Sequence, residues 1–452
     1  MLKGKQFLSV FVGIATCLSI LGGMTGCENT SQKGTDSTSS STSSLDPQKV
    51  TQKINLWTHY GSDDKPKIDY AVSKVKEKYP HLTFQIENMP QDGNQSIKAR
   101  AASGSLPDIM YLSGGLISTF IKSNSIIQLD SYIKSSNFAS ELAPSASKGN
   151  MASSNGHEYV FTCGGAAGLT PALWYYNKKV FDENGVKVPT NYQELLTAVK
   201  AFKAKGVVPM KLWGKEPWPI GAFFDAFAMR ENPKGILALS ENKATSKTYH
   251  SSIEKISTLI KAGIFETGMT NTDYDTAFAA FTSGKAAMFM NGSWSIIDIG
   301  KRMGTNNSVD YFSSYPTGDG SSTKNSMYFV NTSGNGGNVT GYGVSANANN
   351  KAVCADVARI IAINEAKYEY IYEGMTDVSV DITKLKAKVP IAAMNKKLSQ
   401  ELPNMKSEDS ILQNLSNTEF ATGFFEEMQR LIVGEPSSTF EQNIDKLIQQ
   451  SN

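Results

Sequence analysis

Apolar residues in the first third of the chain switch between a period of two and a helical period, and this switching constrains the fold more than any other feature. Residues 54–57 and 82–86 alternate apolar and polar side chains, as strands do. Between them, residues 64–79 place apolar side chains on one helical face. A polar helix over residues 92–104 and a buried apolar strand over 109–112 follow. The alternation predicts an α/β fold with a parallel sheet covered by helices.

The remaining chain carries the same two patterns, so we expect a second α/β unit. Thr190 and Gln193 have the spacing of a capping box at a helix start. Residues 311–349 are rich in Gly, Ser and Asn and are typical of long loops. No fixed period repeats, which argues against a solenoid. The expected strands are 173–177, 286–290 and 342–345, and the expected helices are 190–206, 275–283, one from Trp294, 420–431 and 438–447.

The N-terminus has the pattern of a bacterial export signal. Lys3 and Lys5 precede an apolar run over residues 7–21, and the sequence MTGC stands at residues 24–27. Small residues before a cysteine resemble the lipobox of bacterial lipoproteins, whose cysteine is acylated and becomes the mature N-terminus. We therefore predict a signal peptide over residues 1–26 and lipidation of the cysteine that follows. A plain secretory signal and an uncleaved anchor are the alternatives.

Composition supports a soluble body tethered outside the cell. Residues 28–46 contain 11 Ser or Thr among 19 residues, which predicts an unfolded tether over 27–50. No second apolar run approaches the ~20 residues that span a bilayer, so a multi-span transporter is excluded. The formal charge is +2, and it comes from Lys3 and Lys5, in the segment predicted to be removed. A neutral mature chain argues against nucleic-acid binding.

Cysteine and histidine usage argues against metal or redox chemistry. Beyond Cys17 in the signal and the acylated Cys27, only Cys163 and Cys354 remain, too few for a disulfide framework. They could form one bridge, but two separate buried residues is the simpler interpretation. The four histidines show no metal-ligand spacing, so we predict no metal and no cofactor.

Five segments then carry a resemblance to a known family. They read INLWTHYG, SGSLPDIMYLSGG, ALWYYNKKVFDENGVKVPTNYQELL, FTSGKAAMFMNGSWSI and GYGVS. In this order, from about residue 53 to the C-terminus, the chain resembles the family 1 extracellular solute-binding proteins. The resemblance implies a two-lobed periplasmic-binding-protein-like (Venus flytrap) fold with discontinuous lobes. It places the crossings near 160–165, 312–316 and 360–367, the N-terminal lobe at 51–161 plus 313–365, and the C-terminal lobe at 162–312 plus 366–452.

In open α/β sheets, ligands bind at the carboxyl ends of the strands. Four loops are expected at such ends: 58–64, 113–115, 213–218 and 291–294. A sugar presents C–H faces ringed by hydroxyls, so its site needs aromatic rings beside polar groups, and glycine pairs let the backbone approach closely. The predicted ligand-binding residues are Tyr60, Ser62, Asp63, Ser113, Gly114, Gly115, Trp174, Trp218, Asn291, Trp294, Gly336 and Gly337.

The five tryptophans differ in how strongly they suggest ligand contact. Trp57 lies within a strand pattern and is expected in the core, and alternation leaves Trp174 only one free face. Trp218 stands between two prolines in an expected turn. Trp294 would be a core residue by pattern alone, but the resemblance implies that it stacks on a sugar ring. Asp108 begins its strand, so a structural turn role is expected there.

The resemblance implies a monomeric, non-enzymatic lipoprotein on the extracellular face of the cell membrane. It would bind a sugar and deliver it to the permease of an ABC importer. Separated aromatic platforms favour an oligosaccharide, and the uncharged loops argue against a peptide, polyamine or metal complex as ligand. A secreted, membrane-anchored glycoside hydrolase is the main rival, since two carboxylates could flank a sugar. An adhesive surface protein is a third possibility, although such proteins are usually all-β or repetitive.

Overall fold

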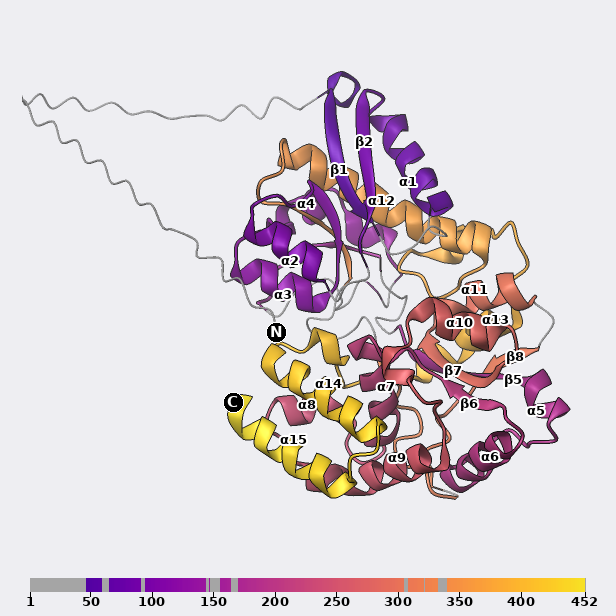
Figure 1. Cartoon of the computed structure of the whole chain (residues 1–452). Coiled ribbons are helices and arrows are strands. Elements are labelled where there is room, and N and C mark those ends of the chain that lie inside the picture. The colour runs from indigo at the N-terminus through magenta and orange to yellow at the C-terminus, as the bar shows by residue number, and fades with distance from the viewer. Residues whose placement is uncertain are drawn as a thin grey trace, which may run out of the picture. The chain divides into compact units, whose positions relative to one another are not determined.

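The protein is described here from a computed structural model (Figure 1). The predicted signal peptide, Cys27 and most of the predicted tether lie outside the described residues. Contacts join the chain from Asp46 onward into one unit. The description covers residues 46–451 except 59–64, 91–93, 144–145, 147–154, 164–169, 305–307, 321 and 332–339.

The first sheet confirms the predicted β-α-β-α-β order. Its strand order is β2-β1-β3-β9-β4, and β1 pairs in parallel with both β2 and β3. β9 returns from late in the sequence and pairs antiparallel with β3 and β4, so the sheet is mixed and discontinuous. The bounds are β1 (Gln52–Thr58), β2 (Leu82–Asn88), β3 (Ile109–Leu112), β4 (Phe161–Thr162) and β9 (Gly341–Val344).

The second sheet has the order β6-β7-β5-β8. β6 and β7 are parallel, whereas β5 is antiparallel to both β7 and β8. All seven residues of β7 are buried, as expected for a strand covered on both faces. The bounds are β5 (Ala172–Asn177), β6 (Val208–Lys211), β7 (Ala286–Gly292) and β8 (Val309–Tyr311).

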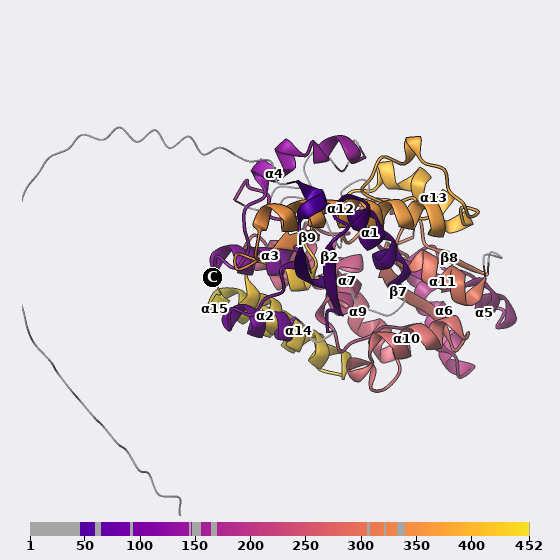
Figure 2. The same ribbon diagram turned by 90° about the horizontal axis from the view of Figure 1, so that it is seen from above.

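Helices cover both sheets. α1 packs beside α12 on the first sheet, as both views show (Figures 1 and 2), and α14 packs beside α15 (Figure 1). The α-helices are α1 (Lys65–Lys78), α2 (Gln95–Ala102), α3 (Gly114–Lys122), α4 (Asp130–Ser135), α5 (Lys178–Glu183), α6 (Tyr192–Ala204), α7 (Pro217–Ala228), α8 (Gly235–Ser240), α9 (His250–Ala262), α10 (Tyr274–Thr282), α11 (Ser295–Met303), α12 (Lys351–Tyr368), α13 (Ala393–Glu401), α14 (Thr418–Ile432) and α15 (Ser437–Ser451). The short helices used below are η5 (Ser246–Tyr249), η7 (Glu369–Glu373) and η10 (Leu412–Asn414).

The hydrophobic cores divide the chain at other places than the predicted lobe bounds. Phe329 and Val330 belong to the core around the second sheet, because the Ala172 N–H donates to the Val330 carbonyl at 2.8 Å and ties this segment to β5. Met375 and Val378 follow α12 and η7 in the sequence and belong to the core of the first sheet. The predicted lobe bounds stay a prediction. In two segments, at Phe329 and Val330 and at Met375 and Val378, the chain packs against the other core than those bounds imply.

Two local predictions were wrong in detail. Residues 217–219 do not form a turn: Pro217 opens α7, where its missing N–H costs nothing, and Trp218 stands in the first helical turn. α6 is capped by Asn191, whose side chain accepts from the Glu194 N–H at 3.0 Å, and not by Thr190. The Thr190 N–H donates instead to the Glu194 carboxylate at 2.8 Å, because glutamate reaches back one turn.

The remaining sequence expectations concern cysteines and membrane spans. Cys163 and Cys354 are both free. Cys354 is fully buried, as predicted, whereas Cys163 is only half-buried. Trp57 is in the core as predicted. The Asp108 carboxylate accepts the Asn55 N–H of β1 at 2.8 Å, so its role is structural, but the bond reaches a neighbouring strand and not its own turn. Among the described residues, no helix combines the length and the apolar character that crossing a membrane requires.

Candidate functional site

Three tryptophans meet at one edge of the second sheet. β6 and β7 are parallel, so their carboxyl ends share an edge. Trp213 follows β6, Trp218 lies in the first turn of α7, and Trp294 follows β7. The ring centroids of Trp213 and Trp218 are 5.1 Å apart, and those of Trp218 and Trp294 are 5.8 Å apart. We call these three rings the tryptophan row.

Exposure increases along the tryptophan row. Trp213 is 2% exposed and packs against Phe289 and Tyr274, with centroids 5.2 and 5.3 Å away. Trp218 is half-buried, and Trp294 is 39% exposed. Trp213 thus supports Trp218 from the core, while Trp294 presents ring surface to solvent. The sequence placed Trp213 and Trp218 in one candidate loop and Trp294 in another, but only Trp218 and Trp294 were predicted to contact a ligand.

The turn after β7 holds Trp294 in place. A Cβ atom at Gly292 would lie 2.1 Å from Cζ3 of Trp294, so only glycine lets this ring lie against the backbone. The Tyr175 hydroxyl donates to the Gly292 carbonyl at 2.9 Å. The Ser293 hydroxyl donates to the Asp377 carboxylate at 2.8 Å. These contacts make the turn a defined support for the ring.

The side chain of Asn291 stabilises the turn after β7. Its side chain is 1% exposed, its Oδ1 accepts the Gly292 N–H at 2.8 Å, and its Nδ2 donates to the Ser295 hydroxyl. Burial and these two bonds leave it no exposed polar atom for a ligand in this structure. Its burial matches that of the rest of β7, all of whose residues are buried.

Trp174 lies in the core instead of at the sheet edge. Its side chain is fully buried, with the rings of Phe223, Phe227, Phe312 and Tyr315 around it at centroid distances of 5.9 to 6.4 Å. The expected free face is covered by α7 and by the segment after β8. Trp174 therefore has no surface for a ligand in this structure, and we do not retain it in the candidate site.

Ser113, Gly114 and Gly115 follow β3, at the carboxyl edge of the first sheet, and open α3. A Cβ atom at Gly115 would lie 2.7 Å from the Gln413 carbonyl oxygen of η10, so glycine permits a close backbone approach. η10 also packs on α7, where a Cβ at Gly221 would lie 2.7 Å from Cβ of Leu412. η10 therefore contacts both α3, which follows β3 of the first sheet, and α7, whose first turn contains Trp218. No sequence pattern signalled η10.

The other predicted ligand-binding residues fall outside the described residues. Tyr60, Ser62 and Asp63 follow β1, and its last residue, Thr58, stands at the same edge as the start of α3 because β1 and β3 are parallel. Gly336 and Gly337 precede β9. These five residues stay predictions.

No sequence pattern indicated two buried carboxyl groups that lie in the same half of the molecule as the tryptophan row. Asp225 of α7 is fully buried and accepts the Ile236 N–H at 2.8 Å, and Asp409 is 3% exposed and accepts the Asn331 N–H at 3.3 Å. Burial raises the pKa of Asp409 to about 7, and burial together with the Asp409 charge raises the pKa of Asp225. Within the described residues, one oxygen of each carboxyl lacks a hydrogen-bond partner. Being enclosed, the pair lends no support to a hydrolase site.

Aromatic side chains beside a few polar groups at the carboxyl edge of an α/β sheet are typical of small-molecule binding sites. The model of the family described as bacterial extracellular solute-binding protein matches residues 61–359, and the chain belongs to this family. A probable sugar-binding periplasmic protein of Brucella suis is 26% identical over 334 residues, which cover 71% of each chain.

Solved structures show the same fold. A structure from a study of xylan utilization by the thermophilic bacterium Caldanaerobius polysaccharolyticus has a TM-score of 0.74 at 22% identity, covering 89% of this chain and 100% of that one. A chitin oligosaccharide binding protein has a TM-score of 0.72 at 20% identity, covering 89% of this chain and 98% of its own. The predicted two-lobed α/β fold and the predicted family are thus confirmed.

Proposed function

We propose that the protein is a receptor for an oligosaccharide outside the cell and delivers it to the permease of an ABC importer. The observation that carries this proposal is the tryptophan row, in which a buried ring supports two more exposed rings. Aromatic faces suit the C–H faces of pyranose rings, and successive rings suit successive sugar units. The similar Brucella suis protein, described as probably sugar-binding, adds support.

The proposed site joins the tryptophan row to the start of α3. Trp218 and Trp294 supply ring surface from the second sheet, and residues 113–115 supply backbone groups from the first. The short helix η10 lies against the elements on both sides. A ligand that contacts both sides favours the arrangement in which they lie close, which is how a two-lobed receptor traps its solute.

Trp294→Ala tests this site. Removing an aromatic anchor of a binding site typically costs about 2 kcal/mol or more, so we expect roughly 30-fold weaker sugar binding. The wild-type protein is first screened by tryptophan fluorescence against a glycan panel, and the best ligand is then titrated calorimetrically into wild type and variant. Met327→Ala, which truncates a 43% exposed residue elsewhere, is the control and should bind like wild type.

Three outcomes would contradict the proposal. If no glycan binds but a peptide or polyamine does, the receptor serves another solute. If a bound glycan is cleaved in a turnover assay, the protein is a hydrolase. If Trp294→Ala binds the glycan as tightly as wild type, sugar binding stands but the tryptophan row is not its site.

We further propose that Cys27 carries the lipid that anchors the protein to the outer face of the membrane. Acylation would be the tether that remains once the signal peptide is cut. Cys27→Ala should move the protein from the membrane fraction to the soluble fraction. A Cys27→Ala variant that still sediments with membranes after a high-salt wash would contradict lipidation and favour an uncleaved anchor.

A further inference from the structure

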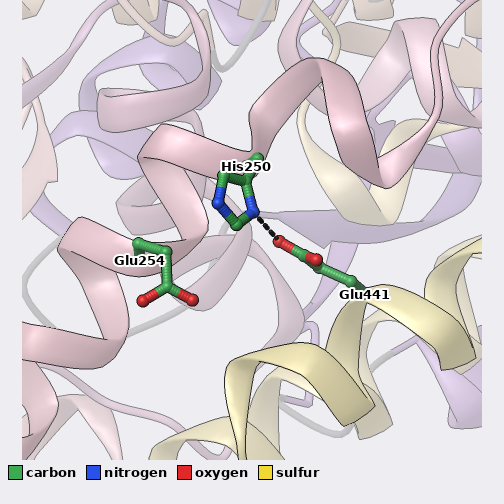
Figure 3. Close-up of side chains that lie close together, drawn as sticks. All are labelled: His250, Glu254 and Glu441. Carbon is green, nitrogen blue, oxygen red and sulfur yellow. Dashed lines mark hydrogen bonds and ion pairs between the residues drawn. The ribbon is translucent and has the colours of Figure 1, made fainter.

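One histidine and two glutamates gather where α9 meets the C-terminal helix. His250 is the first residue of α9, Glu254 stands one helical turn later, and Glu441 belongs to α15, 191 residues further along the chain than His250 (Figure 3). Residues four apart on a helix share a face, so His250 and Glu254 point the same way. The four histidines show no metal-ligand spacing in the sequence, because the third residue of this group comes from a distant helix.

The donor atoms of this group are close and accessible. Nδ1 of His250 lies 2.7 Å from Oε1 of Glu441, and one ligand atom from each of the three residues lies within 4.8 Å of the others. A tetrahedral zinc ion with bonds of about 2.0–2.2 Å needs donors roughly 3–4 Å apart. The side chain of His250 is 62% exposed and that of Glu441 is 21% exposed, so small rotations can bring the donors to that spacing.

The backbone that carries the group is held firmly. Both the N–H and the hydroxyl of Ser246, in η5 before α9, donate to the Asp445 carboxylate at 2.8 Å, one turn beyond Glu441 in α15. Ile253 of α9 and Phe440 of α15 are both buried in the same core. The two helices therefore keep their spacing while the exposed side chains adjust, which is what a binding site with preset backbone positions requires.

From this arrangement we propose that His250, Glu254 and Glu441 bind a zinc ion on the surface and that the ion links α9 to α15. One imidazole and two carboxylates are a ligand set that zinc accepts, with water in the fourth position. The imidazole disfavours Ca²⁺ and Mg²⁺, which prefer oxygen ligands. Zinc replaces the proton that His250 and Glu441 share, so Nδ1 must be unprotonated for binding.

Calorimetric titration of ZnCl₂ into the purified protein, prepared without a histidine tag, tests the proposal. We expect one zinc ion to bind per chain and to raise the melting temperature by mass action. His250→Gln, Glu254→Gln and Glu441→Gln should each weaken binding at least about tenfold, because loss of a ligand costs no less than loss of a partner that orients one. Excess MgCl₂ should not compete.

His157→Gln is the matched control. His157 is also exposed and lies 3.3 Å from a carboxylate oxygen of Asp130, but it belongs to no group of three ligands among the described residues. This variant should bind zinc like wild type. The proposal is overturned if the wild-type protein does not bind zinc, if His250→Gln binds it as tightly as wild type, or if His157→Gln loses binding to the same extent. Melting temperatures without zinc show that each variant is folded.

Discussion

Trp174 lies in β5 and Trp294 follows the neighbouring strand β7, but the two rings have different environments. Trp174 lies within β5, paired with Met290 of β7, and is fully buried among four aromatic rings. Trp294 stands two residues beyond the end of β7 and is 39% exposed. Both residues are tryptophans, so residue type does not explain the difference. Trp174 is inside a strand and is covered by α7, while Trp294 lies past the strand end, where ligands of α/β sheets bind. A position past a strand end does not expose a ring by itself, because Trp213 stands two residues after β6 and is 2% exposed.

Polar groups differ between the same two regions. At the edge, Asn291 and Ser293 form hydrogen bonds within the turn or to Asp377. In the interior, Asp225 and Asp409 each keep one carboxyl oxygen without a partner among the described residues. Because burying an unpaired carboxylate is costly, the interior pair holds protons at higher pH than exposed acids do. Three measurements test whether interior and edge residues differ in this way.

The largest effect is expected at Trp174. Trp174→Ala deletes a fully buried ring and leaves a cavity, so it should lower the free energy of unfolding by about 3–5 kcal/mol in urea titrations. Trp294→Ala should unfold close to wild type, since its ring is partly in water. Equal losses of stability in the two variants would show that Trp294 is a core residue and would remove the contrast.

Asp409→Asn tests the buried carboxyl pair. The pKa of Asp409 is about 7 in the folded protein against 3.8 as its ordinary value, so the folded state binds more protons between about pH 4 and 7. Wild-type stability should therefore fall as pH rises through this window, by at most about 1.4 kcal/mol per pH unit for each proton.

In Asp409→Asn the dependence of stability on pH should be shallower, while the amide oxygen can still accept the Asn331 N–H. Asp225, whose pKa is also raised, retains part of the slope. Unfolding titrations at several pH values provide the measurement. Identical slopes in wild type and variant would mean that Asp409 is ionised throughout the window.

A smaller effect is expected at the edge of the first sheet. Gly115→Ala places a methyl group 2.7 Å from the Gln413 carbonyl oxygen, an overpacking that should cost about 1–3 kcal/mol. Gly300→Ala is the control, because its Cβ position in α11 has no atom within 4 Å apart from its chain neighbours and the backbone of the same helix. It should stabilise the protein slightly, by about 0.5–1 kcal/mol, through helix propensity. If Gly115→Ala is as stable as wild type, the contact between α3 and η10 is looser than described.

Local sequence patterns determined the secondary structure around the site. The strands β1 and β2 fall where alternation predicted them, and β3, β5 and β7 fall where short apolar or aromatic runs predicted them. Both kinds of pattern are properties of neighbouring residues. The same patterns placed Trp294 just past a strand end and Trp57 in the core. The turn predicted at residues 217–219 failed because proline is as compatible with a first helical turn as with a β-turn.

Only the tertiary structure decided which distant residues meet. Trp174 lost its free face to α7 and to the segment after β8, and Gly115 met η10 from near the other end of the chain. Asp225 and Asp409, like His250 and Glu441, are brought together by packing of elements about 190 residues apart. Periodicity reports which face of an element is apolar, but not which element covers that face. Contacts between distant segments depend on how the whole chain packs, so no local pattern of residues contains them.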